Sequence, residues 1–223
     1  LLYSLSGENI SLIDSVYNIS DGTFQFSLAQ RHSGFYRLYL SNNKKLDLIY
    51  DNEDVELVTE ANNILDSLKV FKSESNKIYY EFVKRSKAYK TKTELLQLLL
   101  AQYPDRDEYY HTSKEKLSQV QEEYLYFINV TSQVNPNSFI ARYVGSAQLP
   151  VVEAEIPFDE QLSYLKTHSL DDVNFNDESL IYSDAFTNKS IEYLTYYRNT
   201  QLQLELLEKE FMYTTKWEAQ VPF

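Results

Sequence analysis

The chain has 223 residues and a formal net charge of −12, with 20 tyrosines, four scattered glycines and no cysteine. The missing cysteine excludes thiol nucleophiles, disulfides and zinc–thiolate sites, and the scattered glycines exclude the clustered glycine loops that bind phosphate groups. The excess of acidic residues argues against a nucleic-acid partner, because neutralising phosphates needs a surplus of Lys and Arg.

Residues 1–72 show the period-two alternation of β-strands. Turn residues such as Asp21-Gly22 and Ser33-Gly34 separate the alternating runs, which recur at the spacing of antiparallel sandwiches or barrels. We therefore expect six or seven short antiparallel strands, each with one buried face and one exposed face. The clearest alternating runs are residues 24–28, 36–40, 46–50, 55–57 and 68–70.

From residue 73 the apolar period becomes helical, and a first helix is predicted to begin near Ser73. Thr91 and Glu94 form a capping-box pattern ahead of several leucines, which predicts a further helix that Pro104 ends. A second capping box, formed by Thr112 and Glu115, precedes a wide apolar stripe. The stripe residues expected to be buried are Leu117, Val120, Tyr124, Phe127 and Ile128.

Three shorter signals complete the helical part. Asn135-Pro136 resembles an N-cap followed by proline at the first helical position, with Gly145 as the stop of that helix. Asp159 is expected to cap a short helix. A last helix is predicted over residues 188–213, with an inward face formed by Ile191, Leu194, Leu204, Leu207 and Phe211.

Strands come first and helices second, without alternation, which predicts an α+β fold and not a parallel α/β sheet. We expect an antiparallel β-sandwich-like domain over residues 1–72 and an all-α helical domain over residues 73–223. Both parts carry a net negative charge, so neither is expected to offer a basic face to nucleic acid or to anionic lipid. No apolar run approaches the roughly 20 residues of a membrane span.

The sequence contains few candidates for chemistry. His32, His111 and His168 are far apart, and each lies beside turn or cap residues, so they favour surface positions over a catalytic triad. A cluster of Asp51, Glu53, Asp54 and Glu56 surrounds a predicted turn and could in principle supply an acid and a base. A charged turn in an acidic protein explains the same cluster, and that interpretation is favoured.

The segment from Asp171 to Glu178 partly copies a calcium-binding loop, with Asp172, Asn174 and Asn176 at alternate positions. Asp177 stands where the sharp turn needs glycine, and Ser183 stands where a bidentate Glu is needed. The pattern therefore favours a polar loop that Val173, Phe175 and Leu180 hold against the helices, with Asp177 capping the next turn. No catalytic, cofactor-binding or metal-binding residue is assigned, and no cofactor is expected.

The abundant tyrosines have two interpretations. Adjacent pairs at Tyr79-Tyr80, Tyr109-Tyr110 and Tyr196-Tyr197 place rings on different helix faces, so one ring of each pair should lie near solvent. Tyr packs well at the boundary of a core, and it is also common at interfaces and in glycan-binding sites.

Several short motifs stand out along the chain. In the β-part they are residues 7–16 (GENISLIDSV), 21–26 (DGTFQF), 34–38 (GFYRL) and 46–55 (LDLIYDNEDV), and in the helical part residues 73–80 (SESNKIYY) and 173–180 (VNFNDESL). Together these motifs resemble the N-terminal accessory region of bacterial envelope thiol-disulfide oxidoreductases with a thioredoxin-like domain. In that family a Cys-x-x-Cys domain follows, whereas this chain has no cysteine, so no redox residue carries over.

The resemblance implies a non-catalytic accessory or interaction region that positions a protein partner or a covalently following thioredoxin-like domain. It also implies a periplasmic or envelope location, with a lipid anchor upstream of residue 1 as one option. The alternative is an envelope glycan- or peptide-binding protein that uses exposed tyrosines, and a carboxylate-based hydrolase is the least favoured hypothesis. The oligomeric state is left open.

Overall fold

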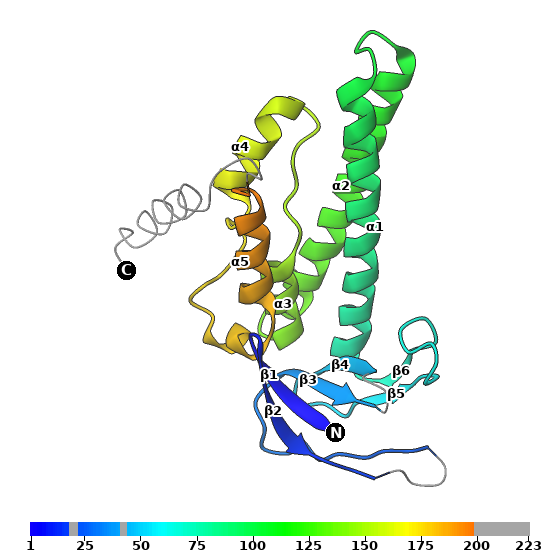
Figure 1. Cartoon of the computed structure of the whole chain (residues 1–223), viewed down its shortest axis with the longest axis vertical. Coiled ribbons are helices and arrows are strands. Elements are labelled where there is room, and N and C mark those ends of the chain that lie inside the picture. The colour runs from blue at the N-terminus through cyan, green and yellow to red at the C-terminus, as the bar shows by residue number, and fades with distance from the viewer. Residues whose placement is uncertain (18–21, 41–43, 199–223) are drawn as a thin grey trace.

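The computed structural model describes residues 1–17, 22–40 and 44–198, and it shows two antiparallel sheets followed by five α-helices (Figure 1). The predicted α+β fold is therefore confirmed. The strands are β1 (Leu2–Ser6), β2 (Asn9–Asp14), β3 (Gly34–Tyr39), β4 (Lys45–Tyr50), β5 (Glu56–Val58) and β6 (Lys69–Lys72). The helices are α1 (Glu74–Gln102), α2 (Glu108–Val134), α3 (Phe139–Ala147), α4 (Phe158–His168), the 3-10 helix η2 (Glu178–Tyr182) and α5 (Ala185–Thr195).

The main sheet has four antiparallel strands in the order β2-β1-β3-β4. Burial does not simply alternate along these strands, because both faces of β3 and β4 are covered. Phe35 and Ile49 join a cluster that contains helical residues, whereas Tyr36 and Leu48 join a second cluster on the other face. The expectation of one exposed face is therefore wrong for these strands. The helices pack against the face that carries Phe35 and Ile49, and the second cluster covers the opposite face.

The second cluster includes residues from outside the main sheet. Phe26 and Leu28 pack against it from a segment that forms no strand, so the strand predicted over residues 24–28 is absent. Leu57 of β5 packs against the same cluster and links the small β5-β6 sheet to the main one.

Two glycines let the main sheet approach η2 closely. Gly7 occupies the β1-β2 turn with a φ of 56°, a conformation that glycine adopts without strain, and its N–H donates to Ile181 and Ser183 carbonyls at 3.1 Å. At Gly34, a Cβ atom would lie 2.7 Å from the Cβ of Tyr182. The 3-10 helix therefore lies against the sheet at Gly7 and Gly34, and at Gly34 a side chain would overlap Tyr182.

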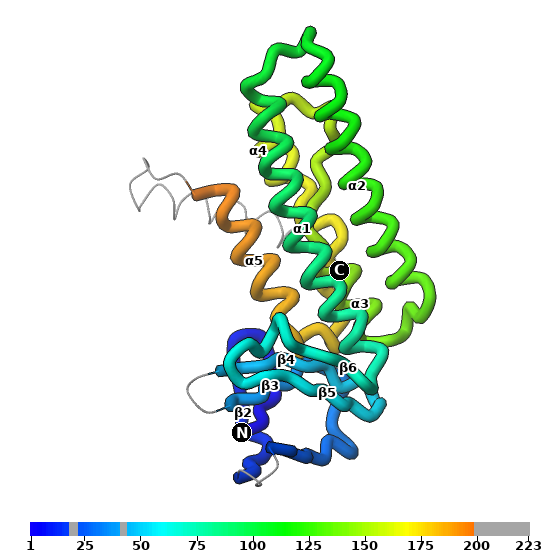
Figure 2. Tube along the Cα trace, turned by 90° about the vertical axis from the view of Figure 1, so that its right-hand side faces the viewer, coloured from blue at the N-terminus to red at the C-terminus, as the bar shows by residue number. Residues whose placement is uncertain are grey.

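Helices α1 and α2 form a long antiparallel hairpin that rises from the sheet (Figures 1 and 2). The predicted start near Ser73 is confirmed, since the Ser73 side chain accepts a hydrogen bond from the N–H of Asn76. Thr91 and Glu94 lie inside α1, so the helix boundary predicted there is wrong. The helix does end before Pro104, as expected.

Three helix boundaries differ from the predicted ones: the start of α2 and both ends of α3. Asp107, and not Thr112, caps α2 by accepting the N–H of Tyr109, and Ser138, and not Asn135, caps α3 by accepting the N–H of Ala141. Gly145 lies within α3, which ends at Ala147. The apolar stripe of α2 is confirmed, with Leu117, Val120, Tyr124 and Ile128 buried and Phe127 partly buried against the core.

Helices α4 and α5 are shorter than the hairpin helices and more exposed. Pro157, and not Asp159, occupies the N-cap of α4, and no side chain caps this end. Ile191 and Leu194 of α5 are exposed, so their predicted inward position is wrong. The remainder of the helix predicted to reach residue 213, with Leu204, Leu207 and Phe211, lies outside the described residues.

The largest hydrophobic cluster combines both parts of the chain. It contains Leu5, Phe35 and Ile49 of the main sheet together with Phe82 of α1 and Phe139 of α3. The change from strands to helices falls between Lys72 and Glu74. A division into domains at this point stays a prediction. No helix in the described part of the chain is both long and apolar enough to cross a bilayer.

Candidate functional site

The acidic turn after β4 joins the sheet to two helices. Glu53 accepts hydrogen bonds from the Ser73 hydroxyl at 2.7 Å and from the backbone N–H groups of Glu74 and Ser75 at 3.1 and 3.0 Å. These groups belong to the first turn of α1, where a carboxylate also interacts favourably with the helix dipole. Burial alone would raise the pKa of Glu53, but these hydrogen bonds outweigh burial and lower it below its ordinary value.

Asp51 accepts a hydrogen bond at the N-terminus of α3, as Glu53 does at the N-terminus of α1. Its Oδ2 accepts the backbone N–H of Phe139 at 2.9 Å, across a separation of 88 residues. Glu56 instead forms an exposed ion pair with Lys72 at 3.1 Å. The two best-placed carboxylates of the cluster are thus committed to separate helix N-termini, and neither faces the other as an acid–base pair.

Asn76 forms the most buried polar contact between the sheet and a helix, and sequence analysis did not single it out. It is fully buried in the first turn of α1. Its Oδ1 accepts the N–H of Ile49 at 2.9 Å, and its Nδ2 donates to the carbonyl of Ile49 at 2.6 Å. The amide therefore pairs both backbone groups at the outer edge of β4, and no local sequence signal indicates this role.

The three histidines lie on separate elements, as their spacing predicted. The ring of His32 stacks on Tyr182, with centroids 3.6 Å apart, and His168 pairs with Asp171 at 2.8 Å. His111 contacts the ring of its neighbour Tyr110. Within residues 1–17, 22–40 and 44–198, no group of three His, Asp or Glu side chains is arranged to hold a metal ion.

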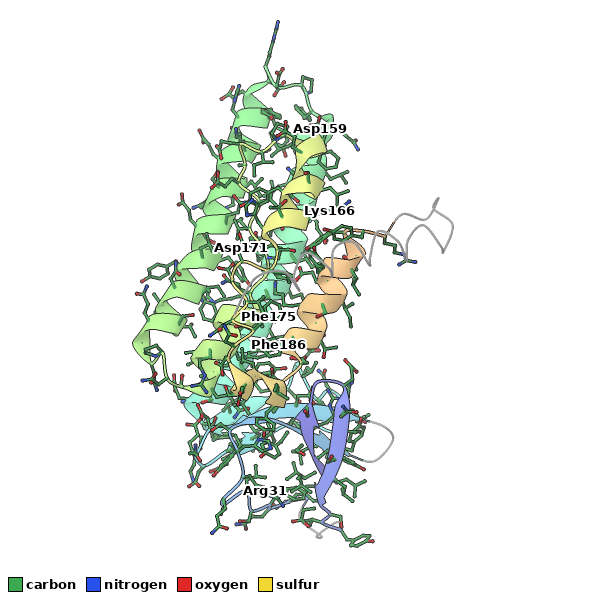
Figure 3. The ribbon with its side chains drawn as sticks, turned by 90° about the vertical axis from the view of Figure 1, so that its left-hand side faces the viewer. Arg31, Asp159, Lys166, Asp171, Phe175 and Phe186 are labelled. Carbon is green, nitrogen blue, oxygen red and sulfur yellow. The ribbon has the colours of Figure 1, made fainter. Side chains whose placement is uncertain are left out.

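The loop that resembled part of a calcium site is held by other contacts. Asp177 accepts hydrogen bonds from the backbone and hydroxyl of Ser179 and forms an ion pair with Arg142 at 3.0 Å, which confirms it as the cap of η2. Val173 and Leu180 are buried as predicted. Phe175 is largely exposed but stacks on Phe186 of α5, and Figure 3 shows these two labelled residues close together.

The tyrosines divide between the core and the surface. Tyr36, Tyr89, Tyr124 and Tyr143 are buried, and burial raises the pKa of Tyr143 well above its ordinary value. Both rings of the Tyr79-Tyr80 pair are partly buried. The expectation that one ring of this pair lies near solvent is therefore not met.

Three exposed tyrosines lie on the α1–α2 hairpin, whereas Tyr17 follows β2 and Tyr182 ends η2. Tyr103 and Tyr109 lie at its tip with ring centroids 5.3 Å apart, and they are 41% and 53% exposed. Tyr109 is more exposed than Tyr110, which agrees with the expectation for that pair. Tyr126 of α2 is also exposed.

Three lysines form a short basic strip along the outer face of α1, whereas the expectation that neither part offers a basic face to nucleic acid or lipid stays a prediction. Lys84, Lys87 and Lys92 are exposed and line a shallow hollow together with Ala88 and Thr91. None of the three lysines forms an ion pair or a side-chain hydrogen bond among the described residues. The same side of the helix continues into Leu95 and Leu98, which are 64% and 55% exposed.

Comparisons with protein-family models, with curated proteins and with solved structures found no match to this chain.

Proposed function

We propose that the chain is a non-catalytic interaction module that binds a protein partner through the outer face of α1. The observation that carries this proposal is the set of three unpaired lysines followed, on the same side of the helix, by exposed Leu95 and Leu98. In a chain of net charge −12, such a strip is a local reversal of charge sign. It fits a partner surface that combines acidic and apolar residues.

The carboxylates that the sequence suggested for catalysis are engaged in structural contacts, which supports a non-catalytic role. Glu53 and Asp51 hold helix N-termini, and Asp177 is occupied by Arg142 and Ser179. By the resemblance to envelope thiol-disulfide oxidoreductases, the partner is a thioredoxin-like domain, either separate or covalently following, in the periplasm or envelope. The module then acts by placing that domain.

A defined probe tests the basic strip. A fluorescent synthetic helical peptide with Glu and Leu on one face is titrated with the whole chain, and fluorescence anisotropy is recorded at low and moderate salt. We expect saturable binding that weakens as salt rises, because exposed charges are screened over about 8–10 Å at moderate ionic strength. Replacing Lys84, Lys87 and Lys92 together with Glu should abolish the binding.

The matched control replaces Lys45, Lys69 and Lys116 with Glu, because these lysines are also exposed but lie on other surfaces. This control changes the net charge by the same amount, so it should weaken binding much less than the strip variant. Absence of binding by the unmodified chain, or equal binding by both triple variants, would contradict the proposal.

The exposed tyrosine pair at the hairpin tip supports a second candidate, the binding of a glycan or a peptide by aromatic stacking. Tyr103 and Tyr109 present two neighbouring rings far from the sheet. A chito-oligosaccharide added to the same titration series separates the two candidates. Saturable glycan binding that persists in the strip variant would favour the tyrosine surface.

A further inference from the structure

A polar hollow of about 340 Å³ lies between α2, α3 and the segment that precedes η2. Asn129 and Ser132 of α2, Arg142 and Gly145 of α3, and Asp172 of the preceding segment are among its lining residues. Its volume falls at the lower end of the range for small-ligand sites, about 300–1,000 Å³. In Figure 3 the segment can be followed through the labelled residues Asp171 and Phe175.

The only basic side chain lining this hollow is Arg142, which forms one ion pair and two hydrogen bonds with neighbouring residues but keeps a buried Nε without a hydrogen-bond partner. Arg142 Nε lies 3.0 Å from the Oδ2 of Asp177, its Nη1 donates to the carbonyl of Asn137 at 2.9 Å, and its Nη2 donates to the Ser179 hydroxyl at 3.0 Å. The guanidinium thus has a carboxylate and two further acceptors. It has little positive charge to offer an anionic ligand.

Asp172 is the lining carboxylate that has no such partner. It forms no hydrogen bond or ion pair among the described residues, although burial raises its pKa. The nearby Lys189 partly offsets that shift but is itself bound to Glu192 at 2.9 Å. With Arg142 and Asp177 neutralising each other, Asp172 leaves the hollow with a net negative charge.

Ser132 supplies a buried unsatisfied group, whereas the Asp172 side chain is exposed to solvent. Its Oγ is buried and has no hydrogen-bond partner, which is unfavourable unless a bound molecule or water supplies one. Gly145 lies beside it, since a Cβ atom built on Gly145 would be in ordinary van der Waals contact with the Ser132 Oγ at 3.6 Å. The Ser132 Oγ has almost no accessible surface, so a ligand reaches this hydroxyl only when neighbouring atoms shift, whereas the Asp172 carboxylate is exposed.

We propose that this hollow binds a primary ammonium group, which donates hydrogen bonds to the Asp172 carboxylate and to the Ser132 hydroxyl. An ammonium has three donors and one positive charge, so it matches one free carboxylate and neighbouring neutral acceptors. The apolar side chains of Ile128, Pro136 and Ala141 also line the hollow and suit the attached alkyl chain. Calcium is a poorer match, because it takes six to eight oxygen ligands and Asp177 is already occupied.

Isothermal titration calorimetry of the whole chain tests this site with 1,5-diaminopentane and with a capped Gly-Lys-Gly tripeptide. We expect saturable binding of at least one amine and none of 1,5-pentanediol, which has the same length without charge. Binding of the diamine alone identifies a small free amine as the source, whereas equal or tighter tripeptide binding identifies a lysine side chain. Failure of both amines to saturate, equal binding of the diol, or displacement of the amine by low calcium concentrations would overturn the proposal.

Two neighbouring carboxylates provide matched variants. Asp172→Asn should weaken amine binding at least about tenfold, because it replaces a charge-assisted hydrogen bond with a neutral one. Asp171→Asn removes an equal charge from the adjacent residue, which pairs with His168 and does not line the hollow, so it should leave the affinity within about twofold. Equal affinities of the two variants would show that the attraction is not specific to this hollow.

Discussion

Glu53 links the turn after β4 to the first turn of α1, and its position makes stability sensitive to acid. Three donors from Ser73, Glu74 and Ser75 converge on its carboxylate. The native pKa is therefore lowered, even though burial alone would raise it. A carboxyl group with a lowered native pKa contributes stability above its unfolded pKa and loses that contribution as the pH falls through the native pKa.

We expect Glu53→Gln to lower the free energy of unfolding by about 1–2 kcal/mol near neutral pH, the usual range for the loss of a helix cap. The difference between the variant and the parent should shrink as the pH falls below the ordinary pKa of 4.5 and through the lower pKa of native Glu53. Urea unfolding at about pH 7 and about pH 3 measures both differences.

Glu56→Gln is the control for this experiment, because Glu56 forms only an exposed ion pair with Lys72. It should change the free energy of unfolding by less than about 1 kcal/mol at either pH. A Glu53→Gln difference that is the same at both pH values would contradict the capping role.

At the scale of single elements, the start of α2 gives a direct comparison of two candidate caps. Asp107 accepts the N–H of Tyr109 at 2.7 Å from an extended backbone, as an N-cap requires. Thr112 lies one turn into the helix, and its hydroxyl donates to the carbonyl of Glu108. Asp107→Ala should cost about 1 kcal/mol of stability, whereas Thr112→Ala should be near neutral, since Ala favours helix interiors.

Thermal unfolding of the two variants, followed by circular dichroism, decides between these caps. The larger decrease in melting temperature should belong to Asp107→Ala. A larger decrease for Thr112→Ala would place the start of the helix at the capping-box pattern, in conflict with the structure.

The same comparison shows why the sequence predicted the helices better than their ends. Thr91–Glu94 and Thr112–Glu115 have the spacing of capping boxes, but a cap also needs a non-helical backbone at its first residue. Both patterns lie on continuous helices that packing holds together, with Tyr89 and Tyr124 stacked between α1 and α2 at 4.2 Å. Residue type and spacing do not reveal that tertiary contact.

For the strands, residue alternation predicted burial better than it predicted hydrogen-bonded pairing. Alternation predicted β3 and β4, and it also predicted a strand over residues 24–28 that does not form. Phe26 and Leu28 are indeed directed to the core, but their segment packs against the sheet and is not paired with another strand. Alternation reports which side chains are buried, and hydrogen-bonded pairing depends on the neighbours that the fold provides.

The candidate sites were also only partly predictable. The sequence drew attention to Asp51, Glu53 and Asp177, and the structure places each of them at a helix N-terminus. For Asp51 the partner is 88 residues away, so no local pattern could reveal it. The lysine strip on α1 depends equally on the fold, because only the packing of α1 shows which lysines stay without acidic partners.

At the scale of the whole molecule, the sheet and the helices are connected by two carboxylates of the acidic turn and by the buried Asn76. Asp51 binds α3, Glu53 binds α1, and Asn76 of α1 pairs with both backbone groups of Ile49. Beneath these contacts, Phe35 and Ile49 share a core with Phe139 and other helical residues. We infer that the β-part and the hairpin open together, so that the partner proposed for α1 would be held rigidly relative to the sheet.

Native-state hydrogen exchange in increasing urea tests this central claim most directly. The amide of Ile49, which donates to Asn76, is compared with buried backbone amides of α1 and α3. We expect their opening free energies to converge on one value, equal to that of global unfolding. If the Ile49 amide exchanges through an opening of clearly lower free energy while the helical amides stay protected, the sheet opens independently and the account is contradicted.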